Sequence, residues 1–328
     1  MLTYAMLIVG FLFLLKGADY LVEGSSSIAK RLGISDLVIG LTVVAFGTSA
    51  PELLVNLVAS LKGNTDIAIG NILGSNISNT LLILGISALI SPLAIKKTTT
   101  WNEIPLNFLA VVVFFLLAND RMIDHASSST LSRIDGLVLL AFFVIFLVYT
   151  IGLAKAGREP ALKDGPHVRT LPMATLMALG GLVALSIGGN WVVSAAVTLA
   201  RQWNVSESLI GLTIVAVGTS LPELATSVIA AFKRKSDIAI GNIVGSNLFN
   251  ILWILGISAT IRPLPLAITT NIDIGVCMAA TLLLFVFCFT PKIRKKFILT
   301  ENYSIERLEG GILLGMYIPY IAYLIWRG

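Results

Sequence analysis

Two stretches of this 328-residue sequence decide its fold: GLTVVAFGTSAPEL at residues 40–53 and GLTIVAVGTSLPEL at residues 211–224. Each precedes a second matching stretch, DIAIGNILGSNISNTLLILGISA at 66–88 and DIAIGNIVGSNLFNILWILGISA at 237–259. The copies align without a gap at an offset of 171 residues, and about thirty of the 49 aligned pairs are identical, far above chance. The chain therefore contains an internal repeat.

The composition is that of a membrane protein. Hydrophobic residues make up 56% of the sequence and charged residues 12%, whereas soluble domains carry about a quarter charged residues. Residues 106–118 and 274–290 contain no charge, which is typical of helices in a bilayer. The apolar stretch 6–15 lacks the basic residues that begin a secretory signal, so it predicts a first spanning helix.

Apolar runs between charged or Pro- and Gly-rich breaks predict ten membrane-spanning helices. They lie at about residues 3–29, 36–61, 67–91, 101–118, 134–153, 172–200, 206–232, 238–261, 270–290 and 309–326. The predicted fold class is an all-α polytopic membrane protein. It divides into a first five-helix repeat at 1–153, a charged connector at 154–171 and a second five-helix repeat at 172–328.

Lys and Arg residues in the predicted loops are distributed unevenly between the two sides of the membrane. If both termini are external, sixteen basic loop residues lie inside and six outside, in agreement with the positive-inside rule. This topology predicts a cytoplasmic connector at 154–171 in a multi-pass protein of the cell (inner) membrane. It also accounts for the net charge of +5 without a nucleic-acid partner.

The two halves are predicted to cross the membrane in opposite directions. Five spans, an odd number, separate the start of one half from the start of the other. Such an inverted repeat places equivalent groups symmetrically about the middle of the bilayer, which suits a site that is reached alternately from each face. The arrangement favours a transporter.

Each copy of the repeat carries a Gly-Thr-Ser-x-Pro-Glu motif in the middle of a predicted span. A proline inside a helix removes a backbone donor and frees a carbonyl oxygen about one turn earlier. A carboxylate at the bilayer centre costs at least ~3 kcal/mol, so Glu52 and Glu223 need a partner. Hydroxyl, carbonyl and carboxylate oxygens suit hard cations such as sodium and calcium. The alternative is a pair of protonated glutamates that only hold helices together.

The helix that follows each motif carries a second polar face. Residues spaced four apart share one side of a helix. They are Asn71, Ser75 and Asn79 in the first copy and Asn242, Ser246 and Asn250 in the second. The serines and the last amides are the better ligand candidates. Other amides serve equally well to bond neighbouring helices: Asn71, Asn242, Asn76 and Asn247. Four glycines are predicted to let helices approach closely: Gly70, Gly74, Gly241 and Gly245.

With these motifs the chain resembles the sodium/calcium exchanger family of the cation/calcium exchanger superfamily, and in particular its prokaryotic members. The resemblance implies a set of ion ligands that are all oxygen atoms. They are the carboxylates of Glu52 and Glu223, the hydroxyls of Thr48, Ser49, Ser75, Thr219, Ser220 and Ser246, the backbone carbonyls of Ala45 and Ala216, and the amides of Asn79 and Asn250.

The resemblance also implies a mode of action, the antiport of about three Na⁺ for one Ca²⁺ by alternating access, with the first and sixth helices sliding past a rigid core. Because one Ca²⁺ neutralises two carboxylates whereas three Na⁺ leave a positive charge, the exchange is expected to be electrogenic. It is expected to need no potassium, because Asn250 stands where potassium-dependent relatives have Asp. We expect no enzymatic activity and no cofactor. The expected partners are Na⁺, Ca²⁺ and the bilayer, with no obligatory protein partner.

Three alternatives remain open. A proton/calcium exchanger of the same superfamily would bind protons on the glutamates, and a divalent-cation channel would also place carboxylates at mid-membrane. A membrane metalloenzyme would normally use histidines, but His125 and His167 fall in predicted loops.

On the first predicted helix, Lys16, Asp19 and Glu23 are interpreted as a mutual charged cluster.

Overall fold

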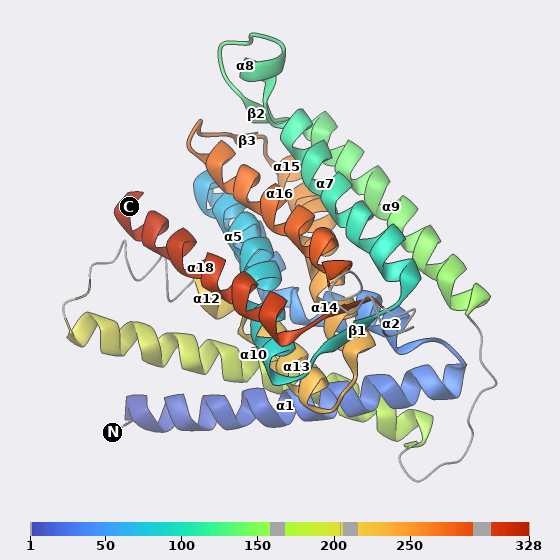
Figure 1. Ribbon diagram of the computed structural model, residues 1–328. Coiled ribbons are helices and arrows are strands. Elements are labelled where there is room, and N and C mark those ends of the chain that lie inside the picture. The colour runs from blue at the N-terminus through green and yellow to red at the C-terminus, as the bar shows by residue number, and fades with distance from the viewer. Residues whose placement is uncertain (1, 158–167, 204, 206–215, 291–302, 328) are drawn as a thin grey trace.

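The computed structural model describes residues 2–157, 168–203, 205, 216–290 and 303–327 of the chain (Figure 1). Residues 158–167 of the predicted connector and 206–215 of the predicted seventh span therefore lie outside the described residues, as do residues 291–302.

The described part of the chain is almost entirely helical. Its α-helices are α1 (Leu2–Leu32), α2 (Asp36–Ile39), α3 (Ala45–Thr48), α4 (Ala50–Lys62), α5 (Thr65–Ile77), α6 (Leu84–Ile90), α7 (Ile104–Leu117), α8 (Asp120–Ile123), α9 (Arg133–Ala156), α10 (Leu171–Gln202), α12 (Ala216–Thr219), α13 (Leu221–Phe232), α14 (Ser236–Leu248), α15 (Gly256–Ile261), α16 (Thr270–Phe287) and α18 (Arg307–Arg327). Wider π-helical turns are η1 (Gly40–Val44), η2 (Ser78–Ile83), η3 (Thr99–Glu103) and η5 (Phe249–Leu255).

Two short antiparallel ribbons, which the sequence analysis did not predict, connect loops at opposite ends of the helices. Strand β1 (Leu93–Ile95) pairs with β4 (Tyr303–Ile305), and β2 (Thr130–Leu131) pairs with β3 (Leu264–Pro265). Each ribbon joins a loop of the first half of the chain to a loop of the second half. The helical fold class is confirmed, with these ribbons as small additions.

Eight described helical segments are long and apolar enough to cross a membrane, or nine if the bent pair Asp36–Thr48 and Ala50–Lys62 counts as one span. The sequence predicts ten. The two motif-bearing spans account for the difference, because the second predicted span bends by 46° at its break and only part of the seventh is described. The multi-pass character is confirmed, while the count of ten stays a prediction.

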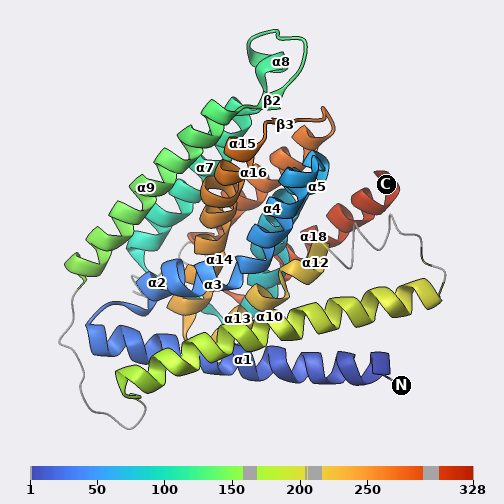
Figure 2. The same cartoon turned by 180° about the vertical axis from the view of Figure 1, so that it is seen from behind.

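The two longest helices, α1 and α10, lie side by side along one edge of the molecule (Figures 1 and 2). A Cβ built on Gly10 would lie 3.0 Å from the backbone oxygen of Gly188, and one built on Gly24 would lie 2.6 Å from that of Ala174. Position 10 therefore meets 188 while position 24 meets 174, which makes the helices antiparallel. Small residues permit this close approach of two backbones.

The most buried of the long apolar helical segments are the equivalent segments α5–η2–α6 and α14–η5–α15. In the most apolar stretch of each, 78% and 94% of the residues are buried. Gly241 and Gly245 pack tightly here, since added Cβ atoms would lie 2.9 Å from the Leu37 oxygen and 2.7 Å from the Ala45 Cβ. This part of the glycine prediction is confirmed. Gly70 and Gly74 have no described atom within 4 Å of an added Cβ, so this part of the prediction stays open.

We expect Gly181→Ala to destabilise the protein and Gly180→Ala to leave it at least as stable. A Cβ at position 181 would lie 2.6 Å from the Gly17 oxygen, whereas one at position 180 would meet no described atom within 4 Å. Overpacking costs about 1–3 kcal/mol, while alanine favours a helix over glycine by about 1 kcal/mol. Thermal unfolding of both variants in the same detergent measures the difference. Equal stabilities would contradict close packing of α1 on α10.

Candidate cation-binding site

The two Gly-Thr-Ser-x-Pro-Glu motifs break their helices in the same way. Ser49 separates α3 from α4 with φ −81° and ψ 7°, and Ser220 separates α12 from α13 with φ −85° and ψ 7°. The proline that follows occupies the first turn of the new helix, where its missing N–H is tolerated. Each glutamate therefore lies in the first turn of a helix that begins inside the protein.

Both glutamates are buried and receive hydrogen bonds from serines. Glu52 and Glu223 are each 1% exposed. Ser75 Oγ on α5 donates to Glu52 Oε1 at 3.3 Å, and Ser49 Oγ donates to Glu223 Oε1 at 3.2 Å. The second bond joins the first half of the chain to the second half, so the two motifs form one site.

Hydroxyl groups complete the contact between the halves. Ser220 Oγ donates to Ser75 Oγ at 3.2 Å, and Thr48 Oγ1 lies 3.5 Å from Ser246 Oγ. The structure thus brings seven of the candidate side chains into contact with at least one other candidate, in three groups. They are Glu52, Glu223, Thr48, Ser49, Ser75, Ser220 and Ser246.

Two symmetric hydrogen bonds fix the threonines. Thr48 Oγ1 donates to Asn242 Oδ1 at 3.0 Å, and Thr219 Oγ1 donates to Asn71 Oδ1 at 3.2 Å. Thr219 is the repeat equivalent of Thr48, and Asn71 is the repeat equivalent of Asn242, each at the offset of 171 residues. Asn71 and Asn242 therefore bond neighbouring helices, one of the two roles that the sequence left open for them.

The amides of the second polar face are held by one another. Asn79 Nδ2 donates to Asn247 Oδ1 at 3.0 Å, and Asn250 Nδ2 donates to Asn76 Oδ1 at 2.9 Å. Asn79 and Asn250 lie in the π-helical turns η2 and η5, a deformation that is frequent at functional sites. Asn76 and Asn247 thus bridge helices, and their bonds orient the two ligand candidates.

Four buried oxygen atoms of the predicted ligand side chains have no hydrogen-bonding partner among the described residues. They are Glu52 Oε2, Glu223 Oε2, Asn79 Oδ1 and Asn250 Oδ1. The four form two pairs related by the repeat offset. Buried polar atoms normally have partners, so a matched set of unpartnered acceptors indicates a binding site for cations.

Of the two predicted backbone ligands, the Ala45 carbonyl already accepts hydrogen bonds within the protein. The Ala45 carbonyl accepts hydrogen bonds from Ser49 N at 3.0 Å and from Thr48 Oγ1 at 3.3 Å. Ala216 is the first residue of α12, directly after an undescribed segment. The structure therefore leaves their role as ligands a prediction.

Sequence reasoning missed the polar residues one turn beyond each glutamate. Asn56 Nδ2 donates to the Glu52 carbonyl at 3.0 Å, and Ser227 Oγ accepts from Asn242 Nδ2 at 2.9 Å. Each stands four positions after its glutamate, the spacing of one helical face. That spacing could have identified them.

The oxygen set suits hard cations. Among the described residues there is no group of three or more His, Cys, Asp or Glu side chains that could hold a metal. The site instead combines two carboxylates with hydroxyl and amide oxygens, which are the ligands that calcium takes in proteins. Soft and transition metals prefer the nitrogen and sulfur ligands that this site lacks.

The comparisons agree with this chemistry. The family described as sodium/calcium exchanger protein matches residues 2–152 and 173–326. The chain is 40% identical to the putative antiporter CaxA of Alkalimonas amylolytica, with 97% of each chain covered, and 31% identical to the sodium/calcium exchanger MaX1 of Methanosarcina acetivorans, with 99% of each covered. A structure of the sodium-calcium exchanger NCX_Mj matches with a TM-score of 0.82 at 33% identity, covering 98% of both chains.

The chain belongs to the sodium/calcium exchanger family. It is therefore a membrane transporter rather than an enzyme. A weaker similarity, 26% identity over 64% of this chain, relates the exchanger to the Ca(2+)/H(+) antiporter ChaA of Bacillus subtilis, of which it covers 63%.

Asp19 and Glu23 of the first helix in this exchanger pair with basic residues of other elements, which corrects the interpretation of Lys16, Asp19 and Glu23 as a mutual cluster. Asp19 on α1 binds Lys233 at 2.6 Å, and Glu23 binds Arg169 at 2.9 Å. Lys233 and Lys235 lie in the connector between α13 and α14. Burial lowers the pKa of Lys235, and the Asp36 carboxylate 3.9 Å away partly opposes that effect. These ion pairs tie α1 to the core.

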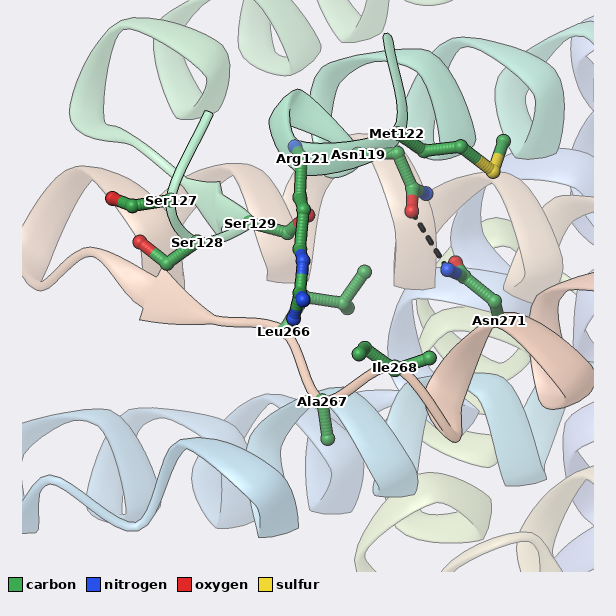
Figure 3. Close-up of a pocket in the computed structure, with 10 residues that line it drawn as sticks. All are labelled: Asn119, Arg121, Met122, Ser127, Ser128, Ser129, Leu266, Ala267, Ile268 and Asn271. Atoms are coloured by element: carbon green, nitrogen blue, oxygen red, sulfur yellow. Dashed lines mark hydrogen bonds between the residues drawn. The ribbon is translucent and has the colours of Figure 1, made fainter. Parts of the chain in front are cut away.

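A cleft of about 410 Å³ lies at the far end of α7, beside the ribbon of β2 and β3 (Figure 3). Asn271 Nδ2 donates to Asn119 Oδ1 across it at 2.8 Å. None of the candidate ligands lines this cleft. It belongs to the loops and is separate from the candidate cation-binding site.

We expect Glu52→Gln and Glu223→Gln each to weaken calcium binding to the purified exchanger by at least about tenfold, equivalent to 1.4 kcal/mol. Each change removes one of two buried charges that oppose the charge of the cation. The exposed Asp66→Asn is the control that loses a carboxylate elsewhere. Isothermal titration measures binding, and thermal unfolding shows whether the variants fold. Unchanged affinity in both glutamine variants would exclude these glutamates as ligands.

Proposed function

We propose that this protein is a secondary antiporter that exchanges Na⁺ for Ca²⁺ by alternating access. The matched set of unpartnered oxygens on Glu52, Glu223, Asn79 and Asn250 carries the proposal. MaX1 and NCX_Mj, which are named sodium/calcium exchangers, support it. The antiparallel packing of α1 and α10, which occupy equivalent positions in the two halves, supports the inverted arrangement that alternating access uses.

The charge of the site supports electrogenic exchange. Two ionised glutamates carry two negative charges, which one Ca²⁺ neutralises. About three Na⁺ in the same site leave one net positive charge, so a cycle that exchanges them moves charge across the membrane.

A cavity of about 240 Å³ adjoins the candidate site. It lies between α10 and the broken helices, and among its lining residues are Pro51, Asn190, Thr219 and Pro222. Thr219 is a candidate ligand. Leu54 and Val193, which also line the cavity, lead toward the ends of α4 and α10 that the topology predicts to be external. The structure thus fits a state that faces outward.

Exchange of protons for calcium is the second candidate, because ChaA is named a Ca(2+)/H(+) antiporter. Two protons would need only the two carboxylates. The unpartnered amide oxygens of Asn79 and Asn250 add neutral ligands that a proton does not require and a sodium ion does. This observation favours sodium.

The experiment is calcium uptake into vesicles that contain the purified protein. We expect uptake when the vesicles are loaded with sodium, none when choline replaces sodium, and no loss when external potassium is replaced by choline. A pH gradient alone should not drive uptake. Uptake driven by a pH gradient would identify the proton exchanger, and calcium entry without any gradient of a second ion would identify a channel.

Asn250→Asp is expected to change cation preference. The carboxylate adds a third negative charge to a site that one Ca²⁺ or a few Na⁺ now balance, and an unbalanced buried charge costs several kcal/mol. We expect weaker sodium-driven uptake that external potassium partly restores. Asn250→Ser, which keeps an oxygen without charge, is the matched control. Identical potassium responses in the two variants would show that Asn250 has only a packing role.

A further inference from the structure

A second buried glutamate lies outside the cation-binding site. Glu103 ends the π-helical turn η3, on the fourth predicted span, and is 0% exposed. The Tyr149 hydroxyl on α9 donates to its Oε1 atom. Its Oε2 atom has no hydrogen-bonding partner among the described residues. Asn107, one helical turn later, is also 0% exposed, and neither its amide oxygen nor its amide nitrogen has a partner there.

The second half of the chain contains a similar tyrosine–acid pair in a charge-balanced form, in which the acid, Asp273, precedes the exact equivalent of Glu103, Ile274. Tyr320 lies 171 residues after Tyr149, the offset of the repeat, and its hydroxyl donates to Asp273 Oδ1 at 3.3 Å. Arg327 Nη1 donates to Asp273 Oδ2 at 2.8 Å. The position equivalent to Arg327 in the first half is Ala156. Arg327 thus balances the charge of Asp273 in the second half, whereas Ala156 at the equivalent position cannot balance Glu103 in the first half.

The described groups that face Glu103 do not neutralise it. Asp237 on α14 repels it. Lys96 binds Asp237 at 2.7 Å and is half-exposed. The remaining titratable side chains on neighbouring elements carry hydroxyl or thiol groups and no basic group: Tyr149, Cys288 and Tyr303. An ionised carboxylate without a partner is costly inside a membrane protein.

We propose that Glu103 is a proton-binding site and holds a proton at neutral pH. The proton removes the unbalanced charge and turns Oε2 into a donor, for which the unpartnered amide oxygen of Asn107 is the nearby acceptor on the same helix. Tyr149 donates to the other oxygen, as it would to the carbonyl of a neutral acid. A metal ion would need several more oxygens than this pair and Tyr149 provide.

Ionisation of Glu103 affects the transport site through α9. Phe143 and Phe146 of this helix stack on Phe249, with ring centroids 5.1 and 6.1 Å apart, and Phe249 precedes Asn250. A proton bound only in the folded protein stabilises it at low pH, and this stabilisation is lost as rising pH removes the proton. We expect stability and exchange to fall at alkaline pH in the wild type and to fall less in Glu103→Gln, which has no proton to lose.

Infrared spectroscopy of the protonated carboxyl band tests the proposal directly. The protein used is the full chain with Glu52→Gln and Glu223→Gln, so that the signal does not come from the transport glutamates and does not depend on the proposed function. We expect a band at neutral pH that Glu103→Gln removes, that Tyr149→Phe shifts in frequency, and that the matched control Asp273→Asn leaves in place.

Three results would overturn the proposal. The first is a band that is absent at neutral pH or unaffected by Glu103→Gln, which would mean that Glu103 is ionised. The second is a band that vanishes when Na⁺ replaces choline at constant pH, which would identify a sodium site. The third is an alkaline loss of stability that is equal in Glu103→Gln and in the protein with native Glu103.

Discussion

Two buried carboxylates that have no basic partner among the described residues are the constraint on which the rest of this structure depends. Glu52 and Glu223 each accept a serine hydrogen bond at one oxygen, and the other oxygen of each has no partner in the described part of the chain. Inside a membrane protein such a pair repels itself and lacks the solvation of water. Such a site suits cations that bind reversibly. Lys or Arg side chains paired with the glutamates would compete with these cations.

The backbone is deformed where this constraint requires it. Ser49 and Ser220 interrupt their helices so that each glutamate begins a new one, and η2 and η5 widen the helices that carry Asn79 and Asn250. Both deformations interrupt regular hydrogen bonding in the buried centre, where lost bonds are costly. Their occurrence at equivalent places in both halves indicates that the site's geometry, rather than local propensity, maintains them.

The sequence identified side chains that the structure brings close together, because its information is local and occurs twice. The motifs place Thr48, Ser49 and Glu52 on one helical face by spacing alone, and the repeat doubles each inference. Partners from distant segments could not be predicted in this way. No spacing indicates that Lys233 binds Asp19 or that the β ribbons join two halves of the chain, because such contacts depend on how helices pack. The division of amide roles between Asn76 and Asn79 likewise follows from bonds across the repeat.

The differences between the halves are as informative as the likeness. A perfectly symmetric inverted repeat would give its two opposite-facing states equal energies. Here Asp19 and Glu23 of α1 have Asn190 and Ser194 as their equivalents on α10, so an ion pair of the kind that Asp19 makes with Lys233 cannot form with Lys62 on the other side. A partly exposed ion pair contributes about 0–1 kcal/mol, and this one is accompanied by the pairing of Glu23 with Arg169. In the proposed alternating-access cycle the two faces would carry different contacts, so their states would differ in energy while the candidate ligands remain equivalent. The proposal thus assigns ion binding and the balance between states to different residues.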